Sequence, residues 1–236
     1  EIAKEMVDST GFNEISLCSL STSDYTGLEE LEAELGEYCK QKRINLALPS
    51  LRISSFKPDM ANNSRRSSLT FAPEAGTQRL RDVINKGVCE EDLLRAVGDA
   101  FESGWQGVKL YFMIGLPTET DEDVLGIAEL ARKVSRLFYQ MPKDKRGKGL
   151  RCTVSASTFV PKPFTPFQWE PQISTEEVLR RQALLRSALK GIRGVEFNCH
   201  FSETSRLEAC FARGDRRLAK VIIGAYTVSY THLRAH

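Results

Sequence analysis

The sequence predicts an α/β fold in which parallel strands alternate with helices, either as an α/β sheet or as a (β/α) barrel. Short apolar runs typical of strands recur along the chain, and helical patterns fill the intervals between them. Such an alternation requires crossover connections between parallel strands. The chain has 236 residues, 41% of them apolar, which is enough for one sizeable core. Both folds place their functional side chains at the C-terminal ends of the strands.

Six segments have strand character, the last of them weaker than the others. They are residues 14–20, 45–51, 68–72, 108–114, 150–159 and 195–198. Between the first two, Leu28, Leu31 and Leu35 recur at helical spacing. The clearest helix follows the fifth strand and opens with Ser174 and Glu177 at capping-box spacing. The alternation contains neither GxGxxG nor GxxxxGK[ST], which argues against the common dinucleotide-binding and P-loop folds.

The composition indicates a cytoplasmic protein that does not enter a membrane. No stretch reaches the roughly 18 apolar residues of a membrane span, and the sequence starting at Glu1 does not have the pattern of a secretion signal. The six cysteines are separated by at least eleven residues each, so no CxxC pair exists. We expect reduced thiols, with secretion and disulfides as the alternative.

Charge is distributed unevenly along the chain. Residues 1–50 carry ten acids and four bases, whereas residues 201–236 carry three acids and six bases, with a net charge of +2 overall. This asymmetry points weakly to a polyanionic partner, and solvated helix faces explain it equally simply.

Polar residues follow the first two predicted strands. Ser21, Ser23 and Asp24 can bind an amino group or ribose hydroxyls, or they can cap a helix. Arg52 stands after the second strand, where its guanidinium suits a carboxylate ligand. A surface ion pair is the alternative for Arg52.

The third strand runs into a turn with a carboxylate, a glycine and a helix start. Glu74 is a candidate to hold a ribose or an ammonium group, and Gly76 is expected to let backbone approach a ligand closely. The start of the helix that follows favours an anion. A solvent-exposed turn is the alternative.

The fourth and fifth strands end in loops of different character. After the fourth, Gly115 and Pro117 predict a flat backbone shelf, and Thr118 or Thr120 is expected to cap the next helix. The loop at residues 159–169 holds three prolines and four aromatic residues, a composition suited to a flat ring such as adenine. A hydrophobic lid packed on the barrel is the alternative for this loop.

Two segments resemble a known family: the Ala-Pro-Glu-Ala-Gly-Thr-Gln-Arg turn at residues 72–79 and, above all, Lys-Leu-Tyr-Phe-Met-Ile-Gly-Leu-Pro-Thr-Glu-Thr at residues 109–120. Together with the polar end of the first strand, they resemble the radical S-adenosylmethionine (SAM) superfamily. The resemblance covers residues 1–226. Residues 164–169 and 211–217 are similar to a subgroup that has an upstream cobalamin-binding-type domain and is related to the methylthiotransferases.

In that superfamily a CxxxCxxC loop after the first barrel strand binds a 4Fe-4S cluster. A reductant such as flavodoxin or ferredoxin supplies the electron that cleaves SAM to a 5′-deoxyadenosyl radical. The resemblance therefore implies an enzyme with SAM and a 4Fe-4S cluster, and it leaves open whether cobalamin takes part. The sequence contains no CxxxCxxC loop. We therefore expect a partial (β/α) barrel of the radical SAM type, with the first strand and cluster loop missing, that is inactive without them.

The resemblance also implies which residues contact SAM. They are Ser21, Ser23, Asp24, Arg52, Glu74, Arg79, Gly115 and Leu116. The first three match the family's motif for the methionine amino group, and the two arginines stand where a carboxylate or ribose contact would lie. The glutamate corresponds to a ribose contact, and the last two residues correspond to backbone beside adenine.

Residues 1–226 are expected to form the core barrel with a C-terminal helical extension, and residues 227–236 a non-native tail, because the tail does not resemble the family. The substrate is not indicated, although modification of RNA or the ribosome would suit the family. Two alternatives stay open: a (β/α) barrel lyase or isomerase acting on a phosphorylated small molecule, and a non-enzymatic RNA-binding module.

Overall fold

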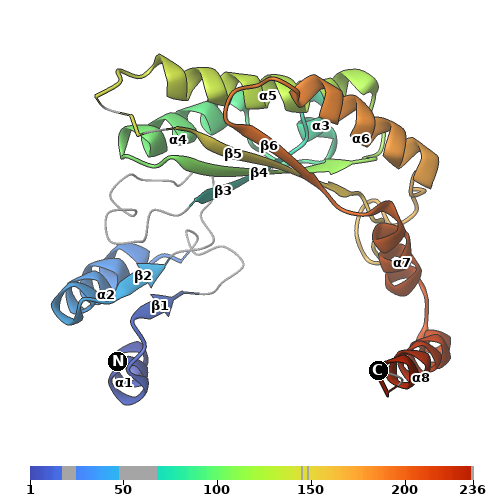
Figure 1. The fold of residues 1–236 in the computed structure, drawn as a ribbon, viewed down its shortest axis with the longest axis horizontal. Helices are drawn as coiled ribbons and strands as arrows, with labels where there is room; N and C mark the ends of the chain where they lie inside the picture. The colour runs from blue at the N-terminus through green and yellow to red at the C-terminus, as the bar shows by residue number, and fades with distance from the viewer. Residues whose placement is uncertain (18–24, 48–67, 145, 148, 235–236) are drawn as a thin grey trace.

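In the computed structural model, helices cover one face of a parallel four-stranded sheet, and the described helices leave its other face open (Figure 1). The structure describes residues 1–17, 25–47, 68–144, 146–147 and 149–234. A two-stranded sheet with two helices forms a smaller unit near the N-terminus, and the last two helices extend from the other end of the main sheet.

The smaller unit has its own apolar centre. Its elements are α1 (Ile2–Thr10), β1 (Glu14–Ser16), α2 (Leu28–Lys42) and β2 (Asn45–Ala47). The two strands are parallel, as the crossover through α2 requires. Leu35, Cys39 and Leu46 are buried together between α2 and β2. Strand β1 ends at Ser16 and β2 at Ala47. The predicted segments continue to residues 20 and 51, and their ends lie outside the described residues.

The main sheet has the order β3-β4-β5-β6, and every neighbouring pair is parallel. Its strands are β3 (Leu69–Glu74), β4 (Gly107–Ile114), β5 (Arg151–Thr158) and β6 (Val195–Cys199). The helices packed with it are α3 (Gln78–Val83), α4 (Glu90–Glu102), α5 (Asp121–Gln140) and α6 (Thr175–Leu189). The predicted α/β class with parallel strands is therefore confirmed, and the weak sixth segment is a full member of the sheet.

Alternation along β4 and β5 separates the two faces of the sheet. In β4, Leu110, Phe112 and Ile114 are buried under the helices, whereas Lys109 and Tyr111 are exposed on the open face. The buried side chains join those of α4 and α5 in one large core. Burial of a large apolar side chain stabilises a fold by about 1.5 to 3 kcal/mol, so this helix-covered face holds most of the packing energy.

Helix starts follow the predicted caps. Ser174 accepts the Glu177 backbone N–H at 3.2 Å, which confirms the start of α6. Of the two threonines expected to cap α5, Thr120 does so in a capping box with Asp123.

The C-terminal part consists of α7 (Ser202–Arg213), a short 3₁₀ helix η4 (Arg216–Leu218) and α8 (Ala219–Arg234). Helix α8 continues past residue 226, so the expected boundary between barrel and tail falls inside one helix. Within the described part of the chain, no helix combines the length and the hydropathy that crossing a membrane needs.

Candidate functional site

The described candidate residues meet at one edge of the main sheet, which we call the rim: the C-terminal ends of β3 and β4 and the loops that follow them. Glu74 and Arg79 come from the β3 side, and Gly115 and Leu116 from the end of β4. These strands are neighbours in register, with Glu74 opposite Phe112. The other predicted contacts, Ser21, Ser23, Asp24 and Arg52, lie outside the described residues.

Glu74 closes β3 in an unusual backbone conformation. Its φ angle is 67°, and the register of β3 against β4 shifts between Phe71 and Glu74. The left-handed region is uncommon for a residue with a side chain. Carboxylate Oε1 accepts a hydrogen bond from Lys86 Nζ at 3.1 Å, and the side chain remains 25% exposed. Glu74 thus presents a carboxylate at the rim with one oxygen engaged by a described partner.

Arg79 joins the first turn of α3 to the loop after β4. Its guanidinium forms an ion pair with Asp123 and donates to the Thr118 carbonyl at 2.9 Å and to the Thr118 hydroxyl at 3.3 Å. Half of the Arg79 side chain is exposed, but its donors already hold two segments together. The predicted carboxylate or ribose contact would have to share these donors.

Asp123 is buried, with 2% of its side chain exposed, and it is the shared partner of several polar groups at the rim. Burial alone would raise the pKa of Asp123, but hydrogen bonds from the Thr77 hydroxyl, the Thr120 backbone N–H and Arg79 lower that pKa to about 2. The carboxylate is therefore ionised and links α3 to α5. The capping-box position of Asp123 after Thr120 was its only signal in the sequence.

The position of Gly76 is explained by a close contact with α5, and its expected role toward a ligand stays a prediction. A Cβ at Gly76 would lie 2.2 Å from the Asp123 carbonyl oxygen and 2.4 Å from the Ile127 nitrogen. A Cβ at Gly126 would in turn lie 2.9 Å from the Gly76 backbone. Two glycines thus let the turn after β3 and helix α5 touch backbone to backbone. Helix α3, six residues long, is capped by Thr77.

Gly115 lies at the end of β4 with a φ angle of 85°, which favours glycine. Its N–H donates to Glu119 Oε2 at 2.7 Å, and Arg181 forms an ion pair with the same carboxylate. Burial raises the pKa of Glu119, while the Gly115 N–H and Arg181 favour its ionised form. The predicted shelf is therefore fixed by a buried carboxylate that the sequence did not single out, since Arg181 lies 62 residues away.

The shelf is covered on one side. A Cβ at Gly115 would meet Ile173 Cδ1 at 2.7 Å, so the space beside this glycine holds an apolar side chain. Leu116 is buried in a small cluster with Ala75, Leu80 and Phe159. Its side chain therefore serves packing, and a ligand could meet Leu116 only through its backbone.

The proline-rich loop after β5 divides its aromatic residues between packing and solvent. The rings of Phe159 and Phe167 contact each other edge to face, with 6.1 Å between their centres, beside the small cluster. Phe164 and Trp169 are 98% and 84% exposed. The lid interpretation therefore fits the first pair, and the other two side chains are free to stack on a flat ring.

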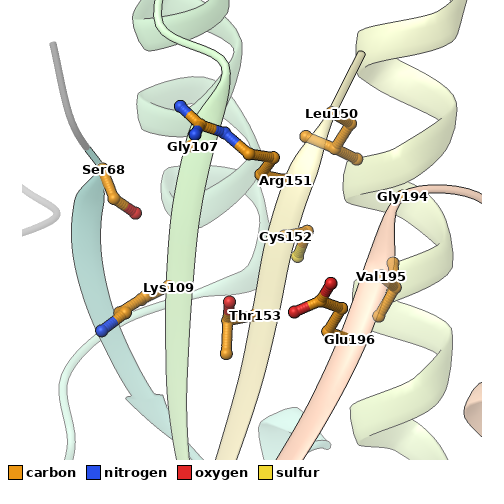
Figure 2. A pocket seen from close by; sticks show the side chains of 10 residues that line it. All are labelled: Ser68, Gly107, Lys109, Leu150, Arg151, Cys152, Thr153, Gly194, Val195 and Glu196. Carbon is orange, nitrogen blue, oxygen red and sulfur yellow. The ribbon is translucent and has the colours of Figure 1, made fainter.

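The open face of the sheet carries a hollow near the N-terminal ends of the strands, with a volume of about 460 Å³ (Figure 2). Lys109, Thr153 and Glu196 lie in one row across β4, β5 and β6. Arg151 projects from the preceding row, beside Gly107. Within the described part of the chain, Lys109, Arg151 and Glu196 form no ion pairs. The hollow thus offers unpaired charges of both signs.

At the rim the described residues offer one part-exposed carboxylate to a ligand, and they offer no ligand set for an iron-sulfur cluster. Glu74 offers a part-exposed carboxylate whose Oε2 accepts no hydrogen bond from a described residue, as a contact to ribose hydroxyls requires. Among residues 1–17, 25–47, 68–144, 146–147 and 149–234, no three His, Cys, Asp or Glu side chains could together hold a metal ion. Cys152, for example, is buried in β5, where burial raises the pKa of its thiol to about 12.

Comparisons with known proteins agree with this arrangement. The family model described as "Radical SAM superfamily" matches residues 1–131, more than half of the 236 residues, and this stretch includes β3, β4 and the rim. An uncharacterised protein of Methanocaldococcus jannaschii is 31% identical over 222 residues, which cover 94% of this chain. The chain spans 46% of that protein's length. With its parallel α/β sheet and this match, the chain belongs to the radical SAM superfamily.

Proposed function

We propose that the full-length protein is a radical SAM enzyme and that this chain supplies most of its barrel, residues 1–226, with residues 227–236 as a non-native tail. The observation that carries the proposal is Glu74: within the stretch matched by the family, its carboxylate stands part-exposed at the strand end where such barrels bind their ligands. When bound, SAM would supply a 5′-deoxyadenosyl radical after reduction by a 4Fe-4S cluster.

The rim residues have distinct proposed roles. Glu74 accepts hydrogen bonds from the ribose hydroxyls, and Lys86 orients its carboxylate. Backbone at Gly115 and Leu116 lies against the adenine, held in place by Glu119. Arg79 positions the loop after β4 through Asp123 and Thr118 and adds a ribose or carboxylate contact.

Residues outside the described part complete the proposal. Ser21, Ser23 and Asp24 bind the methionine amino group, and Arg52 binds its carboxylate. The chain spans 46% of the length of its relative, and we place the cysteines that hold the cluster in a part of the full-length protein outside these 236 residues. A flavodoxin- or ferredoxin-like reductant supplies the electron. An upstream cobalamin-binding-type domain would make cobalamin a second cofactor.

A substrate would reach the rim along the open face of the sheet. This face is polar, with Tyr111, Ser155 and Asn198 following the charged row of the hollow along the strands. A polar substrate suits such a surface better than an apolar one, because its groups can exchange hydrogen bonds with water for hydrogen bonds with the sheet. A nucleotide unit of RNA fits this description.

The test uses the full-length protein, reconstituted without oxygen with iron and sulfide, and follows SAM cleavage by the appearance of 5′-deoxyadenosine. Glu74→Gln should weaken SAM binding by roughly tenfold to a hundredfold, because the amide keeps the shape but removes the charged acceptor. Calorimetry measures the affinity, and iron content should stay unchanged.

Glu102→Gln is the matched control. Glu102 is the exposed last residue of α4, and its substitution removes the same charge as Glu74→Gln. It should bind SAM like the unaltered protein. A full-length protein that takes up no cluster, or that forms no 5′-deoxyadenosine with cluster present, would contradict the function. Unchanged affinity in Glu74→Gln would move the ribose contact to another residue.

A further inference from the structure

A second hollow lies in the helical layer, on the side of the sheet away from the open face. It has a volume of about 400 Å³ and is formed by the C-terminal half of α5 and the turn after α6. We call it the basic hollow, and its main lining residues are Arg132, Ser135, Arg136, Tyr139, Lys190 and Arg193. Four of these six side chains are cations, and no carboxylate of the described residues lines the basic hollow.

The side chains of the basic hollow are partly fixed in place. The Arg193 guanidinium stacks 4.1 Å from the centre of the Tyr139 ring, and the Arg146 guanidinium lies 5.1 Å from the same centre. The Ser135 hydroxyl donates to the Arg193 carbonyl at 2.8 Å and holds the turn against α5. A guanidinium stacked by its face keeps its N–H groups at the edge available for an anion.

The positive charges of the basic hollow are only partly neutralised by described carboxylates. Arg132 pairs with Glu129 on its own helix. Arg136 and Lys190 are exposed, and in the part of the chain that the structure describes neither forms an ion pair. The whole chain has a net charge of only +2, so the concentration of positive charge here is local.

Helix dipoles explain only part of this arrangement. Cations are stabilised near helix C-termini, which accounts for Lys190 and Arg193 just after α6. The effect falls off within the last turn, and the last turn of α5 contains no basic residue. Arg132 and Arg136 lie further from the end of α5, so the dipole does not account for them.

We propose that the basic hollow binds the phosphodiester backbone of a single-stranded nucleic acid. Guanidinium forks match phosphate oxygens, and several cations around one concave surface suit a polymer with regularly spaced negative charges. A flexible single strand can bend its phosphates into a hollow, whereas a flat anionic membrane cannot enter one. The inference rests on charge and shape alone and is independent of the radical chemistry.

The experiment measures binding of a fluorescein-labelled oligouridine of about 12 nucleotides to this chain by anisotropy over a series of salt concentrations. The double variant Arg136→Glu/Lys190→Glu should bind at least about tenfold more weakly. Its slope of log affinity against log salt should fall by about 1.4, since each lost phosphate contact on a single strand removes about 0.7.

The matched control is Lys40→Glu/Lys220→Glu, which changes the net charge equally at exposed positions on α2 and α8. It should keep most of the affinity and the salt slope. Circular dichroism and thermal melting check that both double variants fold. A deoxyoligonucleotide of the same length tests whether the sugar matters, and binding of either oligonucleotide through the basic hollow supports the proposal.

Three results would overturn the proposal: no binding of either oligonucleotide by the unaltered chain, an equal loss in both double variants, or binding only to vesicles containing phosphatidylserine. The second would mean that net charge rather than the basic hollow attracts the strand. In each of these cases SAM cleavage by the full-length protein could still be observed, so failure here is distinguishable from failure of the proposed enzyme.

Discussion

The two ends of the main sheet use their charged residues in opposite ways. At the rim, Arg79 pairs with Asp123, Arg181 with Glu119, and Lys86 with Glu74. In the hollow at the other end of the same strands, Lys109 and Glu196 share a row and form no ion pair with any described residue. Strand β4 has eight residues, so the two ends lie about 25 Å apart.

This difference indicates that the charged residues of the rim stabilise the fold, whereas those of the hollow on the open face are available for binding. Ion pairs at the rim connect loops that are distant in sequence, so a change there should cost stability. The charged side chains of the hollow on the open face form no ion pair with a described residue. A substitution there should therefore leave folding intact and affect only the binding of a ligand. The following changes test this contrast, beginning with the largest expected effect on the free energy of unfolding.

Gly76→Ala should have the largest effect, lowering the free energy of unfolding by about 3 kcal/mol. The new methyl group would collide with the backbone of α5 at Asp123 and Ile127, and backbone cannot yield as a flexible side chain can. Urea denaturation followed by circular dichroism measures the change. Gly98→Ala is the control, because Gly98 lies in α4 with open space around it and should gain about 0.5 to 1 kcal/mol.

Asp123→Asn should lower the free energy of unfolding by about 2 kcal/mol at neutral pH. The amide leaves Arg79 without its charged partner while keeping the size of the side chain. Because folding lowers the pKa of Asp123 to about 2, its contribution is complete above about pH 4 and is lost as the pH falls toward 2.

Melting curves from pH 7 down to pH 2 check this prediction. The unaltered chain should lose stability more steeply between about pH 4 and 2 than Asp123→Asn, so that the difference between the two narrows. Parallel curves over this range would show that the carboxylate does not hold the rim.

Glu196→Ala should have the smallest effect, within about 0.5 kcal/mol of the unaltered chain, because an exposed and unpaired side chain contributes little to folding. The same denaturation experiment measures it. A loss comparable to that of Asp123→Asn would remove the distinction between the rim and the hollow.

Local patterns were sufficient to predict the fold. The apolar runs at β4 and β5 and the caps at Thr120 and Ser174 involve residues close in sequence, and each was found at or within one or two residues of its predicted position. The rim was predictable only in outline. Glu74 and Gly115 were located from the ends of their strands, but no local pattern indicated that Arg181 would pair with Glu119.

Gly76 shows why such details escape sequence reasoning. A glycine in a turn signals close approach, and the signal is the same whether a ligand or a helix approaches. The partner is Gly126, fifty positions further along the chain, and only the packing of α5 brings the two together. The family resemblance predicted a ligand contact for Arg79 but could not predict its ion pair with Asp123, because the two residues are 44 positions apart.

Helix α5 fixes the distance between the rim and the basic hollow. It is one uninterrupted helix of 20 residues, with Asp123 in the rim at its start and Arg136 in the basic hollow thirteen residues later. The two points are therefore held about 20 Å apart by a rigid rod. Anything anchored at Arg136 would sit at a set distance from the rim, and deleting about four residues of the rod would shorten that distance by roughly 5 to 6 Å while leaving both ends on nearly the same face.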